Sequence, residues 1–113
     1  MRKTVIVGIA LWLSVWGLPA FAAETLQYMA TATGAGNVVQ VPDQYQYQTI
    51  QVTISGTSAT VQCQGSLDNK TFETLGSLTA TGACVTEGAW RFVRANISAC
   101  SSCLVSAIVD FAQ

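Results

Sequence analysis

Residues 48–63 read QTIQVTISGTSATVQC, and the alternation of side chains in this stretch decides the fold class of the chain. Apolar residues alternate with polar ones in its first half, at Ile50, Val52 and Ile54. Successive side chains of a β-strand point to opposite faces, so this pattern predicts a strand with one buried face. Gly56-Thr57-Ser58 predicts a turn, and the alternation in residues 59–63 predicts a second strand.

The same period-two alternation continues along the chain, without any long helical periodicity. Further strands are expected at residues 25–33, 37–41, 71–78, 80–88, 90–97 and 104–111. A bulge is expected near Gly76, because the alternation slips there by one residue. Seven or eight short strands between turn signals predict an all-β fold, an antiparallel and jelly-roll-like β-sandwich.

The N-terminus has the features of a secretory signal peptide. Arg2 and Lys3 precede an uncharged apolar run over residues 5–18, and Ala20-Phe21-Ala22 matches the small-residue cleavage pattern. We therefore expect residues 1–22 to be removed, which leaves a single domain over residues 23–113. The mature protein is expected to be exported to the periplasm, the cell surface or the medium, with no membrane segment after cleavage.

The charges of the mature chain exclude some classes of partner and of chemistry. Residues 23–113 carry three positive and six negative side chains, a net charge of −3, which gives no electrostatic basis for binding nucleic acid or anionic lipid. The chain has no histidine, so Ser-His and Cys-His catalysis and the common zinc sites are excluded. The carboxylates are scattered, and we expect no enzymatic activity, no metal and no cofactor.

The four cysteines all lie in the expected mature chain, at Cys63, Cys84, Cys100 and Cys103. An even number in a small exported domain predicts two disulfides. The favoured pairing joins Cys63 to Cys84 and Cys100 to Cys103, with the second pair flanking a two-residue hairpin tip between two strands. The two other pairings stay open. The Cys-x-x-Cys spacing at Cys100 also fits a redox motif, although no helical pattern follows it.

Residues 65–78, GSLDNKTFETLGSL, allow two interpretations. The first is a ligand-binding rim, as in sugar-binding sandwiches, formed by polar loop residues with nearby aromatic rings. Its candidate residues are Ser66, Asp68, Asn69 and Lys70 with Tyr45, Tyr47 and Trp90. The second is a hairpin turn, because Asp and Asn both tolerate left-handed backbone conformations. The turn is favoured, since it explains every residue of the stretch without a ligand.

More than half of the mature chain resembles the small β-sandwich domains of phage tail fibres and virion-surface proteins. The resemblance rests on TISGTSATVQCQGSLDNKTFETLGSLTATG at residues 53–82 and on GAWRFVRANISAC at residues 88–100. The S-x-D-x-x-x-F-x-x-L spacing from Ser66 and the R-F-V-R stretch from Arg91 are also similar to discoidin-like, galactose-binding-like jelly rolls. Both resemblances imply a β-sandwich, and neither implies a catalytic chemistry.

Together these features predict an exported, non-enzymatic β-sandwich with a structural or adhesive role, as a surface, filament or virion-like subunit. One alternative is a carbohydrate-binding module that takes a surface glycan. A second alternative is a small thiol–disulfide protein that uses Cys100 and Cys103. Self-association is expected through the N-terminal strand, because residues 24–41 carry only one charge, at Glu24, and precede the Pro42-Asp43 break. On that reading the segment is only loosely tied to the sandwich.

Overall fold

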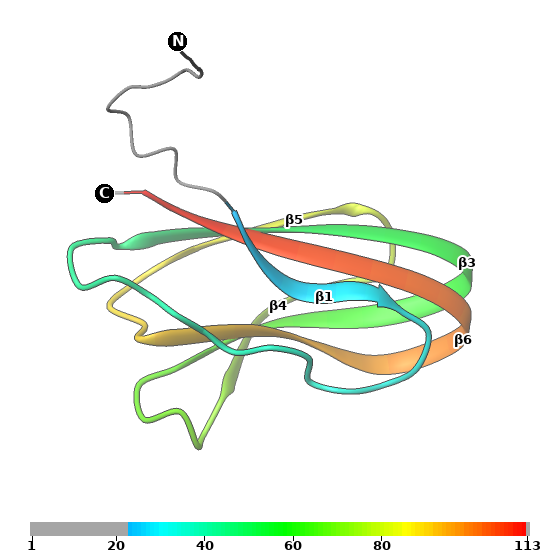
Figure 1. The fold of residues 1–113 in the computed structure, drawn as a ribbon, viewed down its shortest axis with the longest axis horizontal. Helices are drawn as coiled ribbons and strands as arrows, with labels where there is room; N and C mark the ends of the chain where they lie inside the picture. The colour runs from blue at the N-terminus through cyan, green and yellow to red at the C-terminus, as the bar shows by residue number, and fades with distance from the viewer. Residues whose placement is uncertain (1–22, 113) are drawn as a thin grey trace, which may run out of the picture.

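The computed structural model describes residues 23–112, so the predicted signal peptide lies outside the described residues. All regular structure in this range is β-strand, and no helix within it is long and apolar enough to cross a membrane. The six strands, drawn in Figure 1, are β1 (Glu24–Ala30), β2 (Val39–Gln40), β3 (Tyr47–Ser66), β4 (Glu73–Leu78), β5 (Gly82–Glu87) and β6 (Phe92–Ala112).

Two long strands organise the fold. β3 has 20 residues and β6 has 21, and they pair antiparallel from Tyr47 opposite Ala112 to Ser66 opposite Phe92. This two-stranded ribbon folds over on itself, so that each long strand runs through both layers of the molecule (Figure 1). The first half of β3 pairs with β5 and its second half with β4. The start of β6 pairs with β2 and its end with β1.

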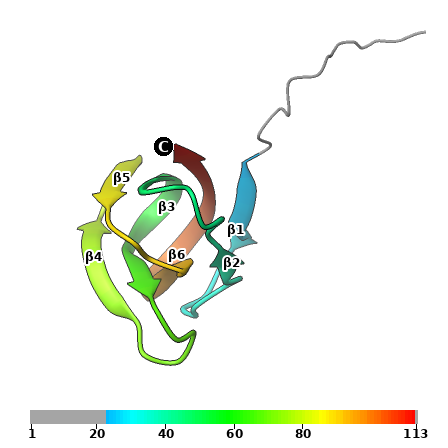
Figure 2. The ribbon, with the colours of Figure 1, turned by 90° about the vertical axis from the view of Figure 1, so that its left-hand side faces the viewer.

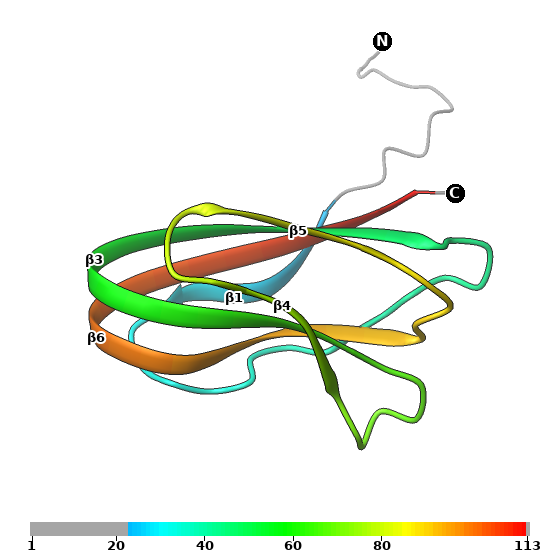
Figure 3. The ribbon, with the colours of Figure 1, turned by 180° about the vertical axis from the view of Figure 1, so that it is seen from behind.

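The pairing therefore gives one layer in the order β1-β6-β3-β5 and another in the order β2-β6-β3-β4, which Figure 2 shows along the strands. Four segments in each layer, connected in this order, form a jelly roll. From behind, in Figure 3, the chain passes from β4 in one layer to β5 in the other. The predicted all-β antiparallel sandwich is confirmed.

Two predicted chain reversals are wrong. Residues 56–58 and residues 100–103 do not form turns between strands: they are the places where β3 and β6 bend together between the layers. Gly56, with φ 95°, and Ser102, with φ 47°, supply the bend. Glycine and serine in the sequence signal a local break in a strand, but they do not show whether the chain reverses or only bends there. That depends on which strand pairs with the residues on either side of the break. The predicted seven or eight short strands are therefore six, of which two are long.

The N-terminal segment is not loosely tied to the sandwich, and that premise is wrong. β1 pairs with β6, and Leu26 is fully buried. The side-chain amide of Gln27 donates to the carbonyl oxygen of Ala95 at 2.7 Å and to that of Gly34 at 3.1 Å. Because Ala95 belongs to the opposite layer, these bonds join β1 to both halves of the sandwich. The strand expected at residues 37–41 shrinks to Val39–Gln40.

The core lies between the layers and consists of the residues that alternate inward along β1, β3 and β6. Its fully buried apolar side chains include Leu26, Ile50, Val52, Val61, Val93, Ile97, Val105 and Val109. The predicted bulge near Gly76 is confirmed by a register shift between β3 and β4, opposite Cys63 and Gln64. A Cβ atom at Gly76 would lie 3.3 Å from the sulfur of Cys84, so glycine leaves room there for a disulfide.

The disulfides form in the favoured pairing. The bond from Cys63 to Cys84 joins the second half of β3 to β5, and therefore links the two layers through the core. The bond from Cys100 to Cys103 spans the bend of β6 rather than a hairpin tip. Among the described residues no cysteine is free.

Candidate functional site

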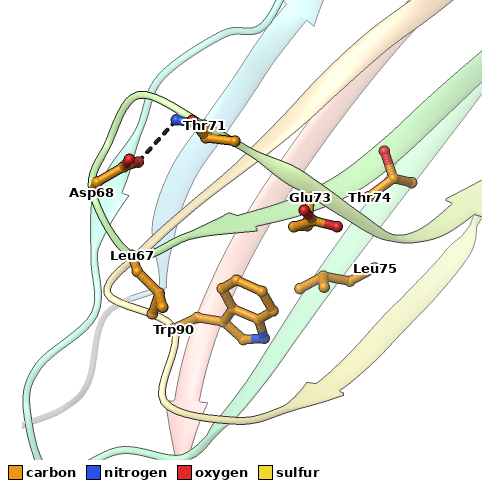
Figure 4. Close-up of a pocket in the computed structure, with 7 residues that line it drawn as sticks. All are labelled: Leu67, Asp68, Thr71, Glu73, Thr74, Leu75 and Trp90. Atoms are coloured by element: carbon orange, nitrogen blue, oxygen red, sulfur yellow. Dashed lines mark hydrogen bonds between the residues drawn. The ribbon is translucent and has the colours of Figure 1, made fainter.

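A hollow of about 470 Å³, which we call the Trp90 hollow, lies beside the loop that connects β3 to β4. This loop is at the end of the sandwich away from the bend (Figure 1). Its lining residues, shown in Figure 4, are Leu67, Asp68, Thr71, Glu73, Thr74, Leu75 and Trp90. They come from the loop after β3, from the first residues of β4 and from the connection between β5 and β6.

The loop on one side of the Trp90 hollow is held by its own polar side chains. One oxygen of the Asp68 carboxylate accepts the backbone N–H groups of Lys70 at 2.9 Å and Thr71 at 2.8 Å. The buried hydroxyl of Ser66 donates to the same oxygen at 3.0 Å and accepts the backbone N–H of Asn69 at 2.9 Å. Asn69 has φ 59°, the left-handed conformation expected of this residue in a turn.

These contacts fix the charge of Asp68. The backbone N–H of Thr71 has the largest effect, followed by that of Lys70 and the hydroxyl of Ser66, and together they lower the pKa of Asp68 below its ordinary value of 3.8. Hydrogen bonds to a carboxylate favour its charged form. The Trp90 hollow therefore keeps a negative charge at one side at neutral pH.

Two glycines position the indole ring of Trp90. A Cβ atom at Gly65 would lie 2.8 Å from a ring carbon of Trp90, and one at Gly88 would lie 3.1 Å from its ring nitrogen. The ring thus packs directly against backbone, where a larger residue would displace it. A Cβ atom at Gly65 would also lie 3.0 Å from a methyl carbon of Leu75, so Trp90 and Leu75 form a continuous apolar floor.

The structure brings together some of the predicted site residues. Asp68 and Trp90 line the hollow, but Lys70 and Asn69 are exposed at the tip and are not among its lining residues. Tyr45 lies on the other side of Trp90. It stacks on Phe111 and lines a second, smaller hollow of about 140 Å³ that shares Trp90 with the first.

Tyr47 begins β3 and lines neither of these two hollows, so the aromatic cluster expected from the sequence is divided. Sequence reasoning missed Leu67, Glu73 and Leu75 as lining residues. The sequence feature that could have indicated the hollow is Leu67, a large apolar residue at the start of a polar turn. In the structure 64% of Leu67 is exposed.

On the outer face of the layer that contains β4, the polar side chains bond to one another. The Arg94 guanidinium lies 3.8 Å from the ring centre of Phe72 and donates to Gln64 at 2.7 Å. Gln64 in turn donates to Thr74 at 3.1 Å. Arg94 is therefore engaged on the face of β3 opposite to Gly65, which faces Trp90. Across residues 23–112, no group of three or more histidine, cysteine or acidic side chains could hold a metal ion.

Fold and site together define a small jelly-roll domain with two disulfides and a hollow at one end. No protein-family model matches the chain, and no curated protein does. Among solved structures it is similar to the SPBc2 prophage-derived protein YomS, with a TM-score of 0.65 and 11% sequence identity over 80% of this chain and 92% of that chain. The likeness at this identity is one of fold. It confirms the resemblance to a phage-type β fold, whereas the discoidin-like resemblance stays a prediction.

Proposed function

We propose that this protein is an exported, non-enzymatic structural or adhesive subunit, part of a surface, filament or virion-like assembly. The observation that carries the proposal is the disulfide between Cys63 and Cys84, which joins the two layers of a jelly roll through the core. Disulfides form and persist in oxidising compartments, and small exported domains use them to compensate for a limited core. The fold likeness to a prophage-derived protein supports a virion-like setting.

The position of the cysteines favours a structural role over thiol exchange. Of the pair Cys100 and Cys103, the first is half-buried and the second is 5% exposed, whereas reactive cysteines are accessible thiols with a lowered pKa. Cys100 and Cys103 also lie within one strand, not at a helix N-terminus. We therefore place the thiol–disulfide alternative below the structural one.

Locating the protein tests this proposal. Antibodies against the mature domain, applied to fractionated cells and to electron microscopy grids, are expected to label surface structures, filaments or particles. The intact mass of the labelled protein is expected to correspond to an N-terminus at Ala23, because the cleavage pattern ends at Ala22. Protein confined to the cytoplasm, with Met1 retained, would refute export and with it the structural role.

We also propose that the subunit self-associates through its N-terminal strand. Tyr28 and Met29 in β1 are 78% and 51% exposed on an edge strand. β1 has two register shifts against β6, and bulged edges are poor templates for a further strand. The contact is therefore made by these apolar side chains and not by a continuous ladder of backbone hydrogen bonds.

A matched pair of edge variants tests this contact. Tyr28→Lys places a charge on β1, and Val85→Lys places the same charge on β5 at the opposite edge of that layer, where Val85 is 72% exposed. Size-exclusion chromatography of the mature domain is expected to show that only Y28K shifts the protein to smaller species. An equal effect of both variants, or an effect of V85K alone, would remove β1 as the contact.

A further inference from the structure

We propose that the Trp90 hollow binds an aliphatic cation, the lysine or arginine side chain of a partner chain. Such a group combines an apolar stem with a positive head, and the hollow offers surfaces for both. The inference rests on the geometry of the hollow and not on the proposed structural role.

The apolar part of the hollow suits the stem. Leu67, Leu75 and Trp90 all line it, and Figure 4 shows the indole ring lying between the two leucines. Leu67 is 64% exposed, so the apolar surface is open to an incoming chain. Lysine and arginine stems pack along apolar surface while their heads stay polar, which fits this floor.

The charges of the hollow suit the head. Its two charged lining residues, Asp68 and Glu73, are both negative. Glu73 and Trp90 both line the hollow, and in Figure 4 the Glu73 side chain lies on the same side of β4 as the ring of Trp90. A cation there would gain both the carboxylate and a cation–π contact, for which tryptophan is the best partner.

The chain itself leaves this carboxylate without a cation. The ion pair found among residues 23–112 joins Arg91 to Asp43, and Arg94 is engaged on the outer face. A neutral sugar could stack on the ring, but it would gain nothing from two negative charges. An anion would be repelled. The charge of the lining therefore favours a cation over both.

A fluorescence titration tests the proposal directly, because Trp90 is the sole tryptophan of residues 23–113. The probes are Nα-acetyl-lysine amide and Nα-acetyl-arginine amide. Nα-acetyl-norleucine amide keeps the aliphatic stem without the ammonium group, and methyl glucoside represents a neutral sugar. We expect a saturable change in Trp90 fluorescence with both cationic probes and weaker binding of the norleucine probe. Binding of the cationic probes is expected to weaken when added salt shortens the Debye length from about 30 Å to about 10 Å.

Two matched variants complete the test. Glu73→Gln removes a charge that lines the hollow and is expected to weaken binding of the lysine probe about two- to fivefold, the range of an exposed ion pair. Glu87→Gln removes an exposed carboxylate outside the hollow and is expected to leave the affinity unchanged. No saturation with either cation, equal binding of norleucine, or an unchanged E73Q would overturn the proposal. Saturation by methyl glucoside alone would reassign the hollow to sugars.

Discussion

Removing the disulfide that links the layers is expected to destabilise the domain of residues 23–113 more than removing the other one. The variant carries Ala at both Cys63 and Cys84, whose sequence separation is 21, against 3 for Cys100 and Cys103. Loop-closure entropy gives about 3 kcal/mol for the longer loop and about 2 kcal/mol for the shorter. Because Cys63 is fully buried, truncating it also removes core contacts, which widens the difference.

The expected loss of stability is large enough to be measured by thermal unfolding. For a domain of this length about 1 kcal/mol changes Tm by 4–8 °C, so the loss of the Cys63–Cys84 bond corresponds to roughly 12–24 °C. Circular dichroism melts would compare residues 23–113 with both disulfides intact, the variant C63A/C84A and the matched control C100A/C103A. A C100A/C103A variant that melts at or below C63A/C84A would refute the reasoning that the cross-layer link holds the jelly roll together.

Three further perturbations follow from the fold. Gly56→Ala is expected to destabilise by about 1–3 kcal/mol, because a side chain is strained at φ 95° and would meet the Ser102 carbonyl; a urea midpoint equal to wild type would contradict this. Gln27→Ala is expected to lower the free energy of unfolding by about 1–3 kcal/mol, because it leaves the buried Ala95 carbonyl without its hydrogen bond. An unchanged urea midpoint would show that this bond does not hold β1. Because the pKa of Asp68 is lowered in the folded protein, its contribution to stability is present above pH 3.8 and is lost as the pH falls through the folded pKa. The NMR amide shifts of Lys70 and Thr71 are therefore expected to titrate with a midpoint below pH 3.8. A midpoint at or above pH 3.8 would contradict the hydrogen bonds of the turn.

Alternation in the sequence predicts the sandwich well, because period-two burial is a local property of each strand. Ile50, Val52 and Val61 point inward as expected, and so does Cys63. The bulge near Gly76 was also readable, since a slip of parity has no other simple cause in a strand.

Long-range pairing is what alternation cannot predict. Gly56 and Ser102 look like turn residues in the sequence, but they lie at the bends of β3 and β6, which face each other. The pairing of β3 with β6 at this point joins residues more than forty positions apart. The attachment of β1 was missed for the same reason. It depends on Gln27 reaching the carbonyl of Ala95, a bond that no local pattern announces.

The candidate site was predictable in part. The Asp68 turn follows from the tolerance of Asp and Asn for unusual backbone conformations, and the structure shows the expected use of that carboxylate on its own backbone. The hollow beside the turn depends on Trp90, which reaches it from the connection between β5 and β6 and packs on Gly65. Only the fold places these residues together.

The mass of the wild-type mature domain in solution tests the structural-subunit proposal most directly. Light scattering on residues 23–113, with both disulfides intact, would be measured over a wide range of protein concentration. The proposal predicts a mass above that of one chain that rises with concentration, because a subunit must contact its neighbours. The mass of a single chain at the highest concentration reached would contradict it.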